Sequence, residues 1–271
     1  MDRRQLLKVS AALGGLSALG GCATTARPGG LLYNPPLAPI RARTDRIFDI
    51  TVCLRPFRAA GPRLDTERIG NALIVHNYGH GGSGWSLSWG SGTIAVKKAF
   101  ANSPREIAVI GCGALGLTSA ILAQKAGAKV TIYAREQLSQ TRSSRATGSW
   151  TPDSRIALAG QAAPDFPALW EEMARISFKT YRDYLGLPGN PVEWIDRYSV
   201  SDVDPDDPKY HNEPPDALDF ASYYRRIRDL TPRPVPLPQG VTPFNAPFVS
   251  RNETLMFNIA DYGHTLMTDF L

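Results

Sequence analysis

A glycine-rich turn constrains the fold of this chain more than any other feature. Gly111, Gly113 and Gly116 lie between an apolar run at 107–110 and a helix-like segment at 117–126, and a second apolar run follows at 129–134. In such a strand–turn–helix unit the first glycine permits a tight turn, the second lets the backbone approach a pyrophosphate, and the third lets helix and strand pack closely. We predict an α/β, doubly wound, Rossmann-like domain that binds a dinucleotide through Gly111, Gly113, Ala114, Leu115 and Gly116. The motif alone does not distinguish NAD from FAD.

The N-terminus has the layout of an export signal. Arg3 and Arg4 precede a short stretch rich in Gly, Ala and Leu, which is shorter than the ~20 residues needed to span a bilayer. The twin arginine favours the Tat route, which carries folded proteins. Residues 19–22 resemble a bacterial lipoprotein cleavage box, which predicts a lipid on Cys22. We expect a periplasmic or membrane-anchored protein, with plain secretion or a cytoplasmic protein as the alternatives.

Charge and cysteine content exclude several classes of function. Removing residues 1–21 lowers the formal charge from +5 to +3, and the basic residues do not form a stripe, so we expect no nucleic-acid partner. Cys53 lies in a predicted strand and Cys112 in the glycine turn, which argues against a disulfide framework. His76 and His80 lie among glycine and other small residues rather than on a helix face, so we expect no metal site.

Hydrophobic spacing predicts the remaining elements. Apolar alternation predicts strands at 47–54 and 71–76, and helical spacing predicts helices at 85–100 and 164–185, although Gly90 and Gly92 weaken the first helix. The proline-rich region 201–247 predicts mostly loop. A short strand at 255–259 and the start of a helix follow.

A second glycine-rich segment points to a flavoprotein family. Residues 74–90, Ile-Val-His-Asn-Tyr-Gly-His-Gly-Gly-Ser-Gly-Trp-Ser-Leu-Ser-Trp-Gly, closely resemble the C-terminal signature of the D-amino acid oxidase family. The resemblance implies FAD as cofactor and a loop that lies against the flavin ring, with the following helix directing its positive end at the ring. N–H groups and a helix N-terminus stabilise an anionic reduced flavin. The loop residues are Gly79, His80, Gly81, Gly82, Ser83 and Gly84.

Other segments carry the same resemblance. Arg55 stands where the family has the arginine that grips the substrate carboxylate, although Cys53 replaces a usual glycine. The resemblance implies that Arg135 and Glu136 lie at the adenosine end of FAD. It also implies a hydroxyl-rich phosphate contact and a stretch that passes over the flavin ring. These are formed by Thr141, Arg142, Ser143 and Ser144, and by Gly148, Ser149 and Trp150, respectively.

The order of these segments differs from that of the family. The arginine–proline and glycine-loop segments are C-terminal in the family but here precede the dinucleotide turn, which indicates circular permutation. We find no run for a returning strand or for the long antiparallel strands of a substrate domain, so we expect a truncated chain with an incomplete substrate domain. None of Tyr198, Tyr210, Tyr223 and Tyr224 is assigned to substrate. The predicted divisions are a signal at 1–22, a tether at 23–45, a permuted FAD-binding domain at 46–185 and a partial substrate domain at 186–271.

The resemblance implies oxidative deamination of D-amino acids to 2-oxo acids, ammonia and hydrogen peroxide, with oxygen as the second substrate. Arg55 would hold the substrate carboxylate and the glycine loop would stabilise the reduced ring. A glycine- or sarcosine-type amine oxidase, a truncated FAD-binding remnant without activity, and an NAD-dependent dehydrogenase are the alternatives.

Overall fold

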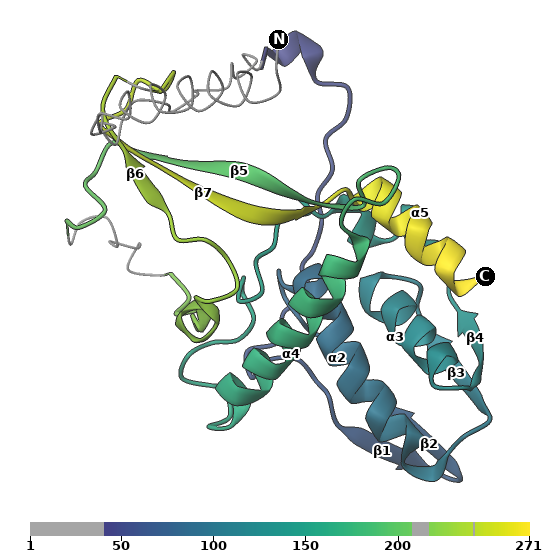
Figure 1. The fold of residues 1–271 in the computed structure, drawn as a ribbon. Coiled ribbons are helices and arrows are strands. Elements are labelled where there is room, and N and C mark those ends of the chain that lie inside the picture. Colours follow the sequence, from purple (N-terminus) through teal and green to yellow (C-terminus); the bar gives the residue numbers. More distant parts are fainter. Residues whose placement is uncertain (1–40, 208–216, 241) are drawn as a thin grey trace, which may run out of the picture.

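The computed structural model describes residues 41–207, 217–240 and 242–271. The predicted signal at 1–22, the lipidation site Cys22, most of the tether and Tyr210 lie outside the described residues. Helices gather on one side of the described chain and a twisted three-stranded sheet extends from the other (Figure 1). None of the helices in the described ranges has the length and apolar character needed to cross a membrane.

The strand–helix–strand unit predicted around the glycine turn is confirmed. β3 (Glu106–Ile110) and β4 (Lys129–Tyr133) pair in parallel, from Glu106 opposite Lys129 to Ile110 opposite Tyr133, and α3 (Ala114–Lys125) connects them. A parallel pair requires such a crossover. The carboxyl ends of both strands therefore meet at one edge, where the glycine turn lies.

The segment before this unit forms a hairpin and a long helix. β1 (Thr66–Ile69), which the sequence did not predict, pairs antiparallel with the predicted strand β2 (Ala72–Val75). The predicted helix α2 (Gly84–Ala99) packs against both α3 and α4 (Phe166–Tyr181). A Cβ on Gly90 would overlap the backbone of Met173, and one on Gly92 would lie 3.1 Å from Leu122 Cδ1. These glycines lower helix propensity but allow the three helices to approach closely.

An aromatic core joins the helices. α5 (Ile259–Phe270) places Tyr262 against α2, where Trp89 Nε1 donates to the Tyr262 hydroxyl over 2.7 Å. The Tyr181 hydroxyl donates to the Trp85 carbonyl. Trp89, Trp170, Tyr181 and Tyr262 are almost fully buried. The remaining short 3₁₀ turns are η1 (Thr44–Arg46), η2 (Phe100–Asn102), η3 (Leu138–Gln140), η4 (Arg142–Arg145), η5 (Arg182–Tyr184) and η7 (Tyr224–Ile227).

The expectation that long antiparallel strands are missing is wrong. β5 (Val192–Ser201) and β7 (Phe248–Phe257) are ten residues each and pair along their whole length, with β6 (Val235–Leu237) on the other side of β7. β5 is exposed along most of its length, and Ile195 and Asp196 interrupt the apolar alternation of its sequence, VEWIDRYSVS. The short strand predicted at 255–259 is the end of β7.

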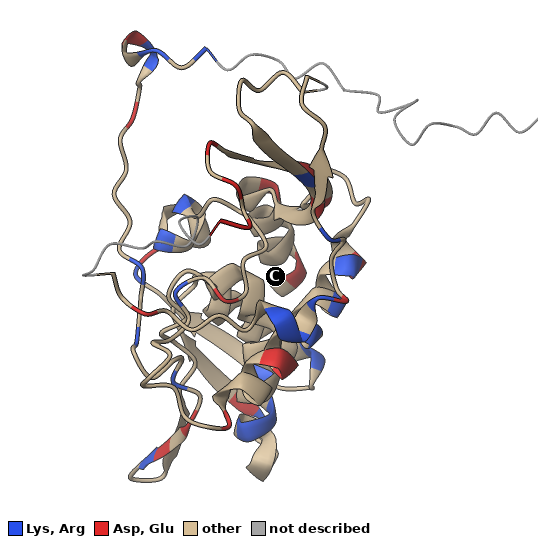
Figure 2. Cartoon of the chain, turned by 90° about the vertical axis from the view of Figure 1, so that its left-hand side faces the viewer, with Lys and Arg blue, Asp and Glu red and all other residues tan. Residues whose placement is uncertain are grey.

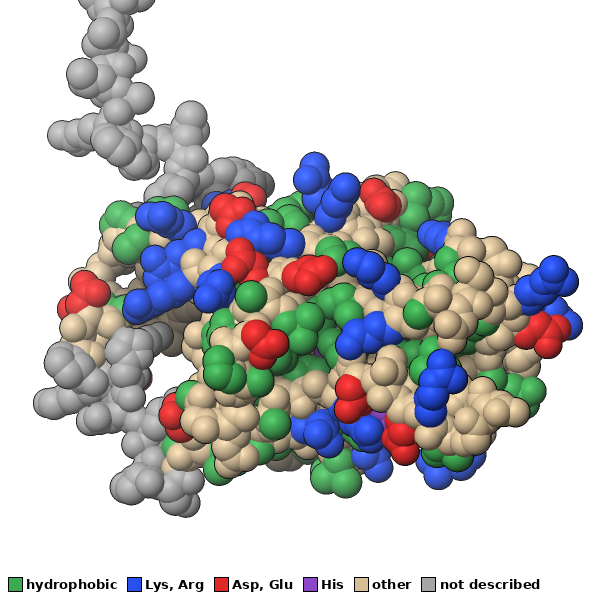
Figure 3. Space-filling model, turned by 90° about the horizontal axis from the view of Figure 1, so that it is seen from below, with side chains coloured by type: hydrophobic (Ala, Val, Ile, Leu, Met, Phe, Trp, Pro, Cys, Tyr) green, Lys and Arg blue, Asp and Glu red, His purple; other side chains and the backbone are tan. Residues whose placement is uncertain are grey.

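The strand predicted at 47–54 is also wrong. This segment is irregular, and its apolar side chains are exposed: Phe48 is 99% exposed and Val52 is 88% exposed. Its alternation is genuine, but no strand of the described residues pairs with it, and a strand needs hydrogen-bonded neighbours. Residues of both charges are interspersed along the ribbon in Figure 2, and on the face drawn in Figure 3 apolar side chains lie between the charged ones.

Candidate cofactor and substrate site

The glycine turn has the geometry that dinucleotide binding requires. Gly111 has φ +101°, a conformation that side chains rarely adopt. A Cβ on Gly116 would overlap the carbonyl oxygen of Gly111, so only glycine lets α3 pack this closely against the turn. Gly113 is the N-cap of α3 and has no capping side chain of its own, while Ala114 and Leu115 begin the helix. The backbone N–H groups at this helix start face the turn.

The structure brings Ser143 to the start of α3. The Ala114 N–H donates to Ser143 Oγ over 3.0 Å, and a Cβ on Gly113 would lie 2.9 Å from the same oxygen. The Thr141 and Ser144 hydroxyls instead donate to carbonyl groups of their own turn, both over 2.8 Å. Arg142 lies in the same turn, η4. An oxygen therefore already lies where a phosphate oxygen would accept from a helix N-terminus.

A cavity of about 530 Å³ lies at the carboxyl end of β4. Its lining includes Cys112, Arg135 and Glu136, and Arg135 Nη2 lies 2.9 Å from Glu136 Oε1. Burial raises the pKa of the Cys112 thiol, which favours its neutral form. The cavity adjoins the glycine turn, because Cys112 belongs to both. A carboxylate at this position can accept a hydrogen bond from a ribose hydroxyl.

The glycine loop is packed tightly against two other segments. The Gly81 N–H donates to the Pro56 carbonyl over 3.0 Å, and the Gly82 N–H donates to the Ser154 carbonyl over 2.8 Å. The Ser83 hydroxyl also donates to the Ser154 carbonyl, over 3.0 Å. Side chains are excluded at three of the glycines: a Cβ on Gly79 would strike Arg58, and one on Gly81 or Gly82 would strike the backbone of 154–155.

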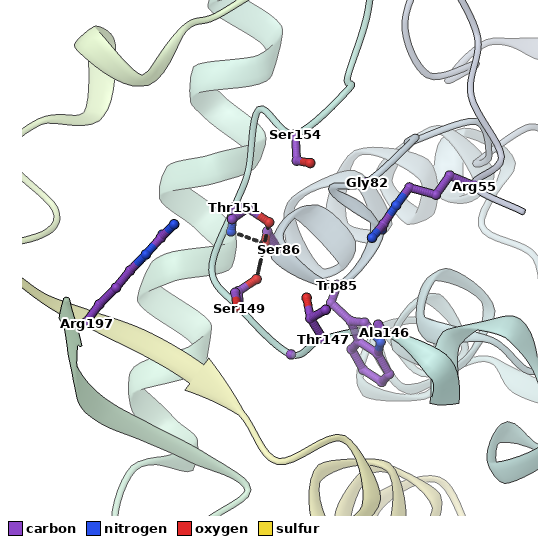
Figure 4. Close-up of a pocket in the computed structure, with 11 residues that line it drawn as sticks. Arg55, Gly82, Trp85, Ser86, Ala146, Thr147, Ser149, Thr151, Ser154 and Arg197 are labelled. Atoms are coloured by element: carbon purple, nitrogen blue, oxygen red, sulfur yellow. Dashed lines mark hydrogen bonds between the residues drawn. The ribbon is translucent and has the colours of Figure 1, made fainter. Parts of the chain in front are cut away.

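These bonds do not use the N–H groups in the first turn of α2. Ser83, the N-cap of α2, makes no side-chain cap hydrogen bond, so the first N–H groups of the helix have no intrahelical or capping acceptor. A cavity of about 140 Å³ opens beside them and is lined by Gly82, Trp85 and Ser86. Figure 4 shows this cavity. Gly84 leaves open space at the helix start.

The segment 146–151 forms the opposite wall of this small cavity. Ser86 Oγ accepts from the Thr151 N–H over 2.9 Å and donates to the Ser149 carbonyl over 3.5 Å (Figure 4). Gly148 has φ +78°, and a Cβ there would overlap the Phe257 carbonyl. Trp150 is buried with no hydrogen-bond partner for Nε1. The α2 N-terminus and residues 146–149 and 151 therefore line the same space.

Two arginines line the small cavity. Arg55 comes from the irregular segment before the glycine loop, and Arg197 comes from β5 on the other side (Figure 4). Arg197 was not among the predicted site residues, because the strand that carries it was not recognised. Neither guanidinium forms an ion pair with a described residue. Both are therefore available to an anion.

A larger cavity of about 630 Å³ adjoins the small one, since Thr151 and Arg197 line both. Trp150 and Tyr224 also line it. Its size is within the range of about 300–1,000 Å³ typical of ligand sites. The site thus extends from the α2 N-terminus toward the three-stranded sheet.

His80 is buried within the glycine loop. Its side chain has no exposed surface, and neither ring nitrogen has a hydrogen-bond partner among the described residues. Burial lowers the pKa of His80 to about 3, so the imidazole is neutral at physiological pH. His80 therefore acts as a packed, uncharged part of the loop.

Residues 106–197 match the family model DAO, described as FAD dependent oxidoreductase. This segment belongs to the DAO family. Among curated relatives, a D-aspartate oxidase from Cryptococcus neoformans is 42% identical over 52 residues, which are 18% of this chain and 13% of the relative. D-amino-acid oxidases from Dictyostelium discoideum and Rubrobacter xylanophilus are each 49% identical, over 53 and 51 residues (19% and 18% of this chain), and 15% of each relative is covered. The matches therefore span about a seventh of the relatives' length.

The DAO-family segment carries an α/β, FAD-dependent fold, and the described residues fit FAD. The cavity at Glu136 suits the adenosine end, the α3 N-terminus with Ser143 suits the pyrophosphate, and the α2 N-terminus lies beside a third cavity. Trp85 connects the last two, because its Nε1 donates to the Ser143 carbonyl over 2.8 Å. Local contacts thus link these places, because Ser143 contacts both Ala114 and Trp85 and Cys112 of the turn lines the cavity at β4.

Proposed function

We propose that this chain takes part in the FAD-dependent oxidation of D-amino acids to 2-oxo acids, with release of ammonia and hydrogen peroxide. The observation that supports this most is the cavity that Arg55 lines together with the start of α2 and with Gly148, Ser149 and Thr151. The relatives reported above, D-amino-acid oxidases and a D-aspartate oxidase, agree with it. An amine oxidase of the glycine or sarcosine type would use the same cofactor segment.

The residues of the chain bind and orient rather than transfer protons. Bound FAD would accept a hydride from the substrate Cα, and oxygen would reoxidise it. Arg55 can hold the substrate carboxylate through two parallel hydrogen bonds. The N-terminal N–H groups of α2 can stabilise negative charge that develops nearby. Rate enhancement would then come from orientation and fixed dipoles.

We also propose that the chain is a circular permutation of the family order. α2 ends at Ala99 and β3 begins at Glu106, so six residues join the glycine-loop segment to the dinucleotide unit. α2 and α3 pack side by side, which lets such a short connection suffice (Figure 1). Domain termini often lie close together, and permutation at such points is tolerated.

The purified chain, loaded with FAD, tests the proposed activity. We expect a flavin absorbance band and peroxide production from D-alanine but not from L-alanine. Arg55→Gln should lower kcat/KM roughly hundredfold, mainly through KM, because it removes a charge-assisted pair with the substrate carboxylate. The exposed Arg105→Gln is the matched control.

Other outcomes decide between the alternatives. Preference for glycine or sarcosine over D-alanine would indicate a related amine oxidase. A yellow protein without peroxide from any amine would indicate an FAD-binding chain without activity. Stoichiometric nicotinamide and no flavin band would contradict the proposal.

For localisation we propose export with lipidation at Cys22. The twin arginine and the cleavage-box resemblance in the sequence support this. Labelling with a radioactive fatty acid should mark the wild-type chain and not Cys22→Ser, and a soluble, unlabelled wild type would contradict lipidation.

A further inference from the structure

The larger cavity beside the candidate site is strongly basic. Arg197 from β5 and two arginines from the segment 228–233 line it, together with Tyr224, Thr231 and Asn252. The basic residues are Arg197, Arg228 and Arg233. Asp153 is the carboxylate of the described lining, and Ser222 Oγ donates to it over 3.3 Å. The lining therefore carries two more positive charges than negative ones.

These arginines lack the partners that other arginines nearby possess. Arg251 on β7 pairs with Asp196 over 2.9 Å, and Arg175 pairs with Glu171 and Asp229 over 2.9 and 2.7 Å. The three cavity arginines form no ion pair within the described ranges. Like charges that share a cavity repel one another, so this arrangement favours binding an anion.

Arg197 connects the basic cavity to the candidate site. It lines both cavities, and its side chain extends from β5 toward Thr151, while Arg55 approaches the small cavity from the opposite side (Figure 4). A ligand whose carboxylate is held by Arg55 would therefore direct its other end toward Arg197.

An amino acid with a neutral side chain has one carboxylate, which Arg55 suffices to bind. The further guanidinium groups suit a second negative group, because guanidinium recognises carboxylate through two parallel bonds. We propose that the substrate of this site is a D-amino acid with an acidic side chain, whose side-chain carboxylate is held by Arg197, with Arg228 and Arg233 contributing positive potential. This inference rests on the proposed oxidase function.

Isosteric substrates test the inference directly. The holoenzyme should show kcat/KM at least tenfold higher for D-aspartate than for D-asparagine, which differs only in replacing the carboxylate by an amide. Arg197→Gln should reduce this ratio at least tenfold, and Arg228→Gln or Arg233→Gln should reduce it less. The control Arg68→Gln, on exposed β1, should leave the ratio unchanged.

A binding measurement separates this inference from the proposed function. Calorimetric titration of the full chain should give at least tenfold tighter binding for malonate than for propionate, with a difference that shrinks at high salt and in Arg197→Gln. Peroxide production with equal D-aspartate and D-asparagine efficiency would overturn the inference but keep the oxidase. Tight, Arg197-dependent malonate binding without peroxide from any amino acid would overturn the oxidase and keep the dicarboxylate site. Equal malonate and propionate binding would overturn the inference by itself.

Discussion

His80 shows how a single buried group can make the stability of the folded protein depend on pH. Its imidazole is fully buried without hydrogen-bond partners, so protonation in the folded state would place an unpaired charge in the core. The pKa of His80 is lowered by burial from about 6.5 to about 3. The unfolded chain therefore takes up a proton at a higher pH than the folded chain does.

We predict that the free energy of unfolding falls as pH is lowered through this window. Between about pH 6.5 and 3 the unfolded state binds the His80 proton and the folded state does not, which costs about 1.4 kcal/mol for each pH unit. Urea denaturation of the wild type and of His80→Asn at pH 7, 6 and 5 measures this contribution. The change of unfolding free energy with pH should be smaller in His80→Asn than in the wild type. His264→Asn, at an exposed position, should retain the wild-type change. Equal slopes in wild type and His80→Asn would contradict the assignment.

At the scale of single residues, some site residues are marked by a local sequence pattern and others are not. Gly111 and Gly116 could be predicted because a positive φ at Gly111 and the close approach of α3 to the turn at Gly116 require glycine, and the structure shows both constraints. Arg197 could not be predicted, since an arginine on an exposed strand has no local signature and gains its place only from the pairing of β5 with β7. The roles of Arg55 and the loop residues remain predictions.

At the scale of elements, α2 contains glycines that lower its helix propensity but allow close packing. Its glycines lower intrinsic helix stability by up to about 1 kcal/mol each relative to alanine. Gly90 faces the Met173 backbone, which cannot move aside, whereas Gly92 faces the end of the flexible Leu122 side chain. Gly84 faces open space.

These environments predict a graded response to alanine. Gly90→Ala should destabilise the protein by about 1–3 kcal/mol or more, because overpacking forces α2 and α4 apart. Gly92→Ala should cost less. Gly84→Ala should be neutral or stabilising by up to about 1 kcal/mol. Urea unfolding followed by circular dichroism ranks the three variants by their free energy of unfolding. A stabilising Gly90→Ala would show that the helices are not in close contact.

Helices and strands could be predicted where one face packs against the rest of the protein, because apolar residues then recur at a regular spacing in the sequence. The helices of the core and the strands around the glycine turn each carry such a pattern. The segment 47–54 carries alternation without a neighbouring strand, whereas β5 has a neighbouring strand although its alternation is interrupted at Ile195 and Asp196. A local apolar pattern is compatible with a strand, but strand formation depends on pairing with residues far away in sequence.

At the scale of the whole molecule, FAD would touch three regions that come from different parts of the chain. These are the cavity at β4, the start of α3 and the start of α2. A ligand that binds only the folded state stabilises it by about 2.7 kcal/mol at a hundred times its Kd.

FAD should therefore raise Tm by roughly 5–10 °C at that concentration, since about 1 kcal/mol corresponds to 2–4 °C for a chain of this size. Differential scanning fluorimetry measures the shift. Gly113→Val should fold, because Ser143 Oγ is the atom that must move, yet its Cβ branch would occupy the phosphate position and abolish the shift. An equal shift with NAD would contradict FAD selectivity.

The position of both glycine-rich turns within residues 76–116 has a consequence for folding kinetics. Contacts between segments close in sequence require little loop closure, and chains rich in such contacts fold faster. The α2–α3 interface, which carries both helix N-termini of the cofactor site, is local in this sense. During synthesis this pair emerges before β5 and β7, so α2 and α3 can pack against each other while the sheet that carries Arg197 is still being translated.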